Sequence, residues 1–111
     1  MRAAVYTLPA YEKQARRLFS PAEKTALEDH IAEAPEAHPV IPGTGGVRKA
    51  RWGRGGRGKS GGVRAIYYFQ VSQYAVYMLT LYAKSERTDL SDDDKRAIKR
   101  IASRLKGRDR T

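Results

Sequence analysis

The side chains best suited to chemistry in this sequence are cations gathered in residues 47–66. This stretch holds seven Lys and Arg residues and no Asp or Glu, within a 111-residue chain whose net charge is +10. A segment without counter-charges attracts phosphates and steers polyanions toward it. A solvated surface is the alternative explanation for any charged run. Here the cations alternate with strand-forming apolar residues, which favours a nucleic-acid ligand.

Two expected strands, residues 47–52 and 63–70, would place these cations on one surface. Side chains of a strand alternate between the two faces of a sheet. Packing the more apolar face of each strand against helices leaves the opposite set together on an open face, namely Lys49, Arg51, Arg64 and Tyr68. Like charges on neighbouring strands repel. Three cations on one face therefore call for an anionic ligand.

Other catalytic chemistries find little support in the sequence. The chain has no cysteine, which excludes disulfides, thiolate zinc sites and cysteine nucleophiles. We expect His30 to be a surface or partly packed helix residue, and His38 lies in a proline-rich stretch without an obvious partner. No pair of carboxylates falls on the basic strands, which argues against glycosidase or metal-dependent nuclease chemistry. We expect no metal and no cofactor, so catalysis would fall to Lys, Arg and Tyr.

The segment between the two strands matches a nucleotide-binding motif only in its letters. Residues 53–60 satisfy G-x-x-x-x-G-K-[ST]. A P-loop needs a helix after the motif, whereas a strand is expected at 63–70. We interpret the segment as a flexible hairpin tip that touches the RNA backbone. With neighbouring strand residues it gives the predicted RNA-binding set: Arg48, Arg54, Arg57, Lys59 and Tyr68.

Periodicity and capping signals predict the element order β-α-α-β-β-β-α. Ser20 and Glu23 form a capping box at the start of the second helix, and Ser91 caps the last helix. Prolines and glycines forbid regular structure in residues 35–46. Short links between the later strands predict an antiparallel meander. The strands are expected at residues 5–8, 47–52, 63–70 and 74–83.

The expected fold class is α+β, with one domain spanning residues 1–111. It would consist of a small, mainly antiparallel sheet, a helical hairpin on one face and a C-terminal helix. No apolar run approaches the ~20 residues needed to cross a bilayer, and the N-terminus lacks the apolar stretch of a signal peptide. We therefore expect a cytoplasmic protein without a membrane partner.

The order of elements and three runs of residues resemble the RelE superfamily of bacterial toxins, and within it the HigB-like branch. The runs cover residues 40–52, 61–68 and 82–90, and the first joins a Pro-Gly-Thr-Gly-Gly loop to a basic strand. The resemblance implies a RelE-like fold and a toxin of a type II toxin–antitoxin module. Toxins of the RelE and HigB kind cut messenger RNA in the ribosomal A site without metal. The implied partners are the ribosome, mRNA and a cognate antitoxin, with a helix-turn-helix, encoded by the adjacent gene.

The resemblance also implies functional positions. Those that match the family's basic residues on the second, third and last strands are Lys49, Arg51, Arg64 and Lys84. Two departures stand out. Ser85 occupies the place of a RelE arginine, and the place of RelE's catalytic tyrosine falls near Ser91. An acid–base role for tyrosine would pass to Tyr68 or Tyr82, or be absent.

The chemistry implied is cleavage of RNA by its own 2′-hydroxyl. Proton transfer would fall to Lys49 or Lys84, because crowding by other cations lowers the pKa of a lysine. Arg51 and Arg64 would stabilise charge on the phosphate. The alternatives are a non-catalytic basic module that binds nucleic acid or the ribosome, and a ParE-like inhibitor of DNA gyrase. The cations lie on strands as well as in the tip, which favours the nuclease.

Overall fold

The computed structural model describes residues 1–53 and 62–107. Three predicted RNA-binding residues, Arg54, Arg57 and Lys59, lie outside the described residues. The elements are β1 (Ala4–Thr7), α1 (Pro9–Leu18), α2 (Pro21–Glu33), β2 (Val47–Trp52), β3 (Val63–Gln70), β4 (Ala75–Ala83) and α3 (Asp92–Gly107). Their order is the predicted one. None of the helices in the described part of the chain is long and apolar enough to cross a membrane.

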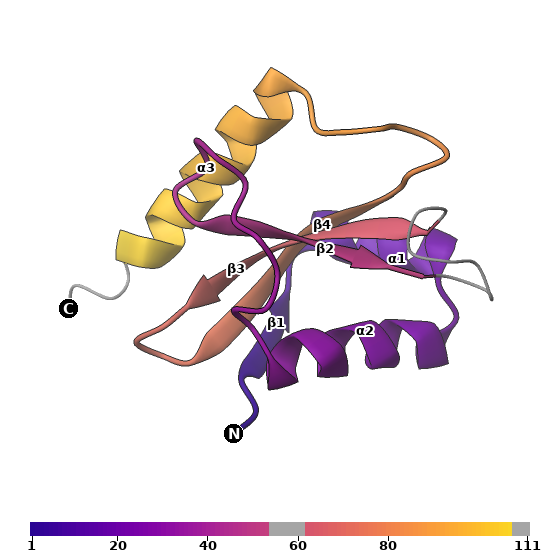
Figure 1. Ribbon diagram of the computed structural model, residues 1–111, viewed down its shortest axis with the longest axis horizontal. Helices are drawn as coiled ribbons and strands as arrows, with labels where there is room; N and C mark the ends of the chain where they lie inside the picture. Colours follow the sequence, from indigo (N-terminus) through magenta and orange to yellow (C-terminus); the bar gives the residue numbers. More distant parts are fainter. Residues whose placement is uncertain (54–61, 108–111) are drawn as a thin grey trace.

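The strands form one mixed sheet in the order β1-β4-β3-β2 (Figure 1). The pairs β2–β3 and β3–β4 are antiparallel, as the meander prediction requires. β1 runs parallel to β4 and pairs with only its first half, from Ala4 beside Ala75 to Thr7 beside Met78. A parallel partner needs a long crossover connection. The helices and strands between β1 and β4 provide it.

The first two helices cover one face of the sheet, as expected for the helical hairpin. Tyr11 of α1 and Leu27 of α2 are fully buried against sheet residues such as Tyr67. The Ser20–Glu23 capping box is present, with each side chain bonded to the backbone N–H of the other residue. The capping box fixes the start of α2.

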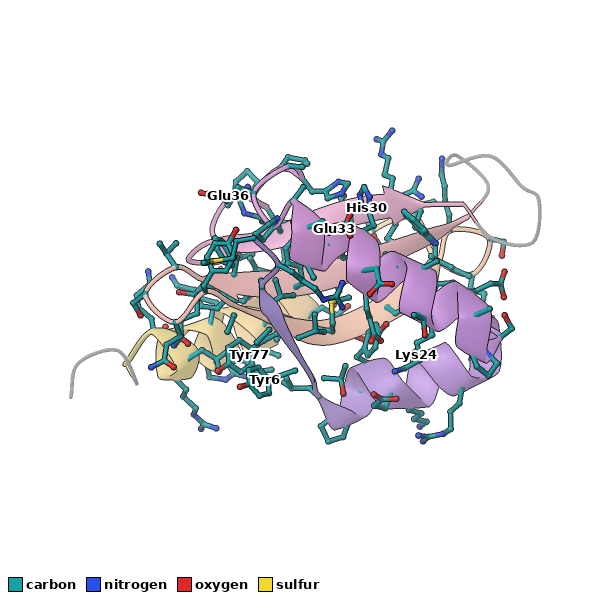
Figure 2. All side chains as sticks on the ribbon, turned by 90° about the horizontal axis from the view of Figure 1, so that it is seen from below. Tyr6, Lys24, His30, Glu33, Glu36 and Tyr77 are labelled. Carbon is teal, nitrogen blue, oxygen red and sulfur yellow. The ribbon has the colours of Figure 1, made fainter. Side chains whose placement is uncertain are left out.

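An ion-pair link joins these two helices. Lys24 of α2 contacts Glu12 of α1 at 3.3 Å and Glu28 of its own helix at 2.9 Å (Figure 2). Tyr11 donates a hydrogen bond of 2.8 Å to the same Glu28. Burial of the phenol and the acceptor carboxylate both raise the pKa of Tyr11, so its hydroxyl stays protonated as a donor.

The other face of the sheet was expected to be open and is instead covered by α3. Figure 1 shows α3 and α2 on opposite sides of the sheet. Ile98 and Leu105 of α3 are buried in a second core with Ile66 and Leu79. Ser91 caps the helix as predicted, since its hydroxyl accepts from the backbone N–H of Asp94 at 3.1 Å. The apolar stripe of α3 needs burial, and the apolar residues on this face of the sheet provide the surface for it.

Residues 35–46 fold back along the outer edge of β2. The backbone N–H of Ile41 donates to the carbonyl of Val47 at 2.8 Å, and the backbone N–H of Lys49 donates to the carbonyl of Pro39 at 3.1 Å. The buried Thr44 hydroxyl donates to the carbonyl of Ile41 at 2.6 Å and accepts from the N–H of Val47 at 3.1 Å. Gly46, with φ of 106°, has a backbone conformation that favours glycine. The segment thus covers an edge strand that would otherwise expose unpaired backbone groups.

The two histidines contact each other, so the expectation that His38 lacks a partner is wrong. The Nε2 atoms of His30 and His38 lie 2.9 Å apart. The His30 ring also packs on Trp52 of β2, with ring centroids 4.9 Å apart. Residue spacing along the chain does not reveal this contact, because it depends on how residues 35–46 fold back toward α2.

β4 contains one extra residue that changes which side chains share a face. Ile66 pairs with Thr80 and Tyr67 pairs with Met78, so Leu79 is a bulge between them. Before the bulge, Met78 faces the helical pair. After it, Tyr82 faces α3, in the same core as Leu79. The bulge therefore brings Tyr82 to the face that carries the cations.

Candidate functional site

A row of polar side chains crosses three strands on the α3 side of the sheet. Arg51 of β2 pairs in register with Arg64 of β3, and Arg64 pairs with Tyr82 of β4. Lys49 lies two residues before Arg51 on β2 and therefore shares its face. The prediction that these three cations share one face is confirmed. We call Lys49, Arg51, Arg64 and Tyr82 the basic row.

Burial differs sharply along the basic row. Arg51 is exposed, Lys49 keeps 27% of its side chain exposed, and Arg64 is only 4% exposed. Arg64 donates from Nη1 to the carbonyl of Val63 at 3.3 Å. A guanidinium is charged at all relevant pH values and offers a rigid fork to phosphate oxygens. The positive charges of the row therefore extend from Arg51 in solvent to Arg64 in the interior. Electrostatic attraction is stronger in the interior because the dielectric constant is lower there.

An acidic residue from the β4–α3 connection joins the site. Asp89 Oδ1 lies 3.6 Å from Lys49 Nζ. The backbone N–H of Leu90 donates to the same carboxylate at 2.8 Å, and this bond, helped by Lys49, lowers the pKa of Asp89. Asp89 is therefore ionised at neutral pH. Asp89 is not among the predicted site residues, because carboxylates were considered only on the basic strands. In the sequence, Leu90 is an apolar residue after six polar or charged ones, which indicates that the segment packs against the protein at this point. In the structure Leu90 is buried.

In the described part of the chain, three side-chain ion pairs link the connection, residues 84–90, to the rest of the protein. Arg17 of α1 makes two contacts of 2.7 Å with Glu86. Arg87 pairs with Asp94 at the start of α3, and Lys49 pairs with Asp89. The connection therefore contacts α1, β2 and α3 through charges that lie near the surface.

Tyr82 lies beneath this connection. The Arg87 guanidinium stands 5.4 Å from the centre of the Tyr82 ring. Tyr82 is 5% exposed, and its hydroxyl oxygen is buried without a hydrogen-bond partner among the residues that the structure describes. Burial raises the pKa of Tyr82, and the charge of Asp89 raises it further, against the opposing charges of Arg64 and Arg87. The site thus holds a neutral phenol beside cations.

The remaining predicted residues fall in different places. Lys84 is exposed directly after β4, where its backbone N–H donates to the carbonyl of Gly62 at 3.0 Å. Tyr68 was expected on an open face, but it is only 6% exposed and packs in the core beneath α3.

Arg48 lies apart from the basic row. It alternates onto the face of the helical pair, and its Nη1 donates to the carbonyl of His38 at 2.6 Å and that of Glu36 at 3.2 Å. Arg48 therefore anchors the segment that covers the β2 edge. RNA binding by Arg48 and Tyr68 stays a prediction.

The elements on either side of the P-loop-like motif differ from those of a P-loop. β2 ends at Trp52 and β3 begins at Val63, so a strand follows the motif where a P-loop would have a helix. A side chain at Gly62 would meet the Trp52 carbonyl oxygen at 2.0 Å, which reserves this position for glycine. Within residues 1–53 and 62–107, no three His, Cys, Asp or Glu side chains converge as metal ligands.

Comparison with known proteins finds one family and a group of solved structures. The family model described as the RelE toxin of the RelE/RelB toxin–antitoxin system matches residues 31–111. A mutant of the E. coli toxin RelE in the free state is 20% identical, with 91% of this chain and 99% of that chain covered and a TM-score of 0.62. A chain of the intact E. coli RelBE toxin–antitoxin complex is 18% identical, with 73% of this chain and 95% of that chain covered and a TM-score of 0.56. At these identities the structures establish the shared fold.

Proposed function

The chain belongs to the RelE toxin family, and from this premise we propose that it is a ribosome-dependent, metal-independent endoribonuclease that cuts messenger RNA and so inhibits translation. The observation that carries the proposal is the basic row, in which Lys49, Arg51 and Arg64 share one face of the sheet. Two guanidiniums in direct register repel each other. A phosphate diester between them would relieve that repulsion.

The chemistry needs little beyond positioned charge and proton transfer. The RNA 2′-hydroxyl loses its proton and attacks the adjacent phosphorus, and the bond to the 5′-oxygen breaks as that oxygen gains a proton. The products are a 2′,3′-cyclic phosphate, or the 3′-phosphate formed from it by water, and a 5′-hydroxyl. Arg51 and Arg64 would stabilise the added negative charge. Lys49 or Lys84 would transfer protons, with Lys49 already in an ion pair at the site.

We further propose a HigB-like variant of the family site. Ser85 stands where RelE has an arginine, and Ser91 caps α3 near the place of RelE's catalytic tyrosine. The chain therefore has to perform the reaction with a different set of groups around the same basic strands. A cognate antitoxin is part of the proposal, because the RelE fold to which this chain is similar is found in a toxin–antitoxin complex.

The deciding test is cleavage on programmed ribosomes. Purified protein is mixed with ribosomes that hold a defined codon in the A site, with and without EDTA, and the RNA ends are mapped. Cleavage that needs the ribosome, survives EDTA and leaves a 5′-hydroxyl supports the proposal. Absence of cleavage combined with inhibition of gyrase supercoiling would replace it with the ParE-like alternative, and binding without either activity would support the non-catalytic module.

A further inference from the structure

The hydroxyl of Tyr82 is an anomaly in the free protein. Buried polar atoms are almost always hydrogen-bonded, and leaving one unpaired costs stability. Yet this oxygen is buried without a partner among the described residues. Tyr11 and Tyr67, which are fully buried, follow the rule, since Tyr11 donates to Glu28 and Tyr67 donates to the carbonyl of Pro35 at 2.8 Å. A phenylalanine would fill the Tyr82 site without this cost.

The surroundings of Tyr82 identify the kind of group that its hydroxyl lacks. Arg64 is its register neighbour, and the Arg87 guanidinium stands over its ring. Asp89 is close enough to affect its ionisation and touches Lys49 at 3.6 Å. The site therefore combines two guanidiniums, an ammonium and a neutral donor. A phosphate diester, with two charged oxygens that accept hydrogen bonds, fits this combination.

Asp89 supplies the negative charge that the free protein needs at this place. Its carboxylate is bound by the Lys49 ammonium and by the backbone N–H of Leu90. Asp89 thus contacts the basic row through Lys49. An incoming phosphate would meet Lys49 with this carboxylate already bound to it, so the two anions compete.

We propose that the RNA backbone binds through a phosphate at a site formed by Tyr82, Arg64 and Lys49. In the free protein the Asp89 carboxylate occupies this site. The phosphate displaces the Asp89 carboxylate and accepts a hydrogen bond from the Tyr82 hydroxyl. The identity of the phosphate as that of RNA rests on the proposed function. The displacement requires residues 86–89 to shift, while Leu90 stays buried in the second core. The side chains of Glu86, Arg87 and Asp89 are held by ion pairs near the surface, each of which contributes little to stability.

The proposal makes a signed prediction for Tyr82→Phe. Removing an unpaired buried hydroxyl leaves the melting temperature of the free protein unchanged or raises it. The same change lowers the affinity for a phosphate diester about tenfold or more, because a hydrogen bond to a charged group is lost. A purely structural role for Tyr82 predicts no change in affinity.

The probe is a short 2′-O-methyl RNA, which carries phosphate diesters but no nucleophile. Its dissociation constant is measured by calorimetry for the wild type, Tyr82→Phe and the control Tyr77→Phe. Tyr77 lies on the same strand but stacks on Tyr6, with ring centroids 5.2 Å apart (Figure 2). The control should bind as the wild type does. Equal affinity of Tyr82→Phe and the wild type, or no binding of the probe by the wild type, overturns the proposal.

A second variant tests the displacement without touching Tyr82. Asp89→Asn keeps an oxygen for the Leu90 N–H but removes the competing charge. We expect it to bind the probe several-fold more tightly, because the phosphate no longer displaces a carboxylate from Lys49. Weaker binding by Asp89→Asn would show that Asp89 supports the ligand rather than competing with it, which overturns the proposal even if Tyr82→Phe fails to fold.

These results separate the inference from the proposed function. A protein that never cleaves RNA on ribosomes but loses probe affinity in Tyr82→Phe keeps the phosphate site and loses the nuclease. A protein that cleaves on ribosomes and binds the probe equally well with Tyr82→Phe keeps the nuclease and loses this site.

Discussion

Arg64 combines two features that disfavour folding, since it is nearly buried and it faces a second guanidinium across the β2–β3 pair. Burying a charge and pairing like charges in register are both destabilising. A protein that keeps such a residue gains elsewhere, and the gain that fits this site is stabilisation of negative charge on a phosphate.

For Arg64→Ala we expect messenger cleavage on programmed ribosomes to slow by about a hundred- to a thousand-fold, because removing one positioned donor from a transition state costs about 3–4 kcal/mol. The measurement is the single-turnover rate at saturating protein, with a melting curve to establish folding. Arg2→Ala removes the same charge from an exposed pair with Asp29 and should cleave normally. Equal rates for Arg64→Ala and the wild type would exclude Arg64 from the active site.

Residue types and alternation were enough to place the cations but not the groups that surround them. Lys49, Arg51 and Arg64 share a face because strand side chains alternate with period two, a property written directly in the sequence. Asp89 and the His30–His38 contact arise from connections between elements. Such contacts depend on a folded path that no local pattern specifies.

At the scale of elements, the buried Thr44 determines how the segment that covers β2 is held. Replacing it with valine removes the hydroxyl while keeping the volume, and leaves the N–H of Val47 without that acceptor. We expect Thr44→Val to lower the free energy of unfolding by about 2 kcal/mol, since a buried unpaired group costs about 1–3 kcal/mol. Urea unfolding measures the loss. Thr44→Ser keeps the hydroxyl and should lose clearly less; equal losses in both variants would refute the hydrogen-bond explanation.

The start of α3 gives a pH-dependent prediction. The Asp94 carboxylate accepts from the N–H of Ser91 and pairs with Arg87, and its pKa is lowered below the ordinary 3.8, chiefly by the Ser91 bond. A carboxyl with a lowered folded pKa stabilises the protein above its unfolded pKa and loses this contribution as pH falls through the folded value. We expect Asp94→Ala to be about 0.3–1 kcal/mol less stable than the wild type near neutral pH, because a carboxylate in the first turn stabilises a helix.

This difference should shrink as the pH falls below about 4, because the wild type then loses the same contribution. Urea unfolding between pH 3 and 7 follows it. Asp92→Ala removes a charge from the same helical turn and serves as the control. A difference between Asp94→Ala and the wild type that stays constant down to pH 3 would contradict the role of the ionised carboxylate.

Local sequence patterns predicted the bounds of helices and strands better than they predicted how these elements pack against each other. The bounds of β2 and β3 agree with the predicted 47–52 and 63–70, because glycines and prolines flank runs of β-forming residues. Covering of the second face by α3 was not foreseen. The apolar stripe of α3 requires a partner but does not say which surface provides it.

For the whole molecule, the uneven distribution of charge leads to a prediction about partners. Residues 47–66 carry a net +7 within a chain of +10. Expression of the protein alone should arrest growth, and co-expression with the adjacent gene should restore growth and yield a stable complex. An acidic segment of the antitoxin would complement the basic strands. Normal growth with soluble wild-type protein, or purification of free monomer from the co-expressing cells, would contradict this expectation.

The bulge at Leu79 has a consequence for how relatives of this protein are compared. Because side chains alternate along β4, one inserted residue exchanges the two faces for all residues that follow within the strand. A relative without the bulge would carry the counterpart of Tyr82 one position closer to the start of β4. An alignment drawn without a gap would then equate a residue of the α3 side of the sheet with one of the opposite core. Functional positions beyond this point are transferred reliably only after the strands themselves have been superposed.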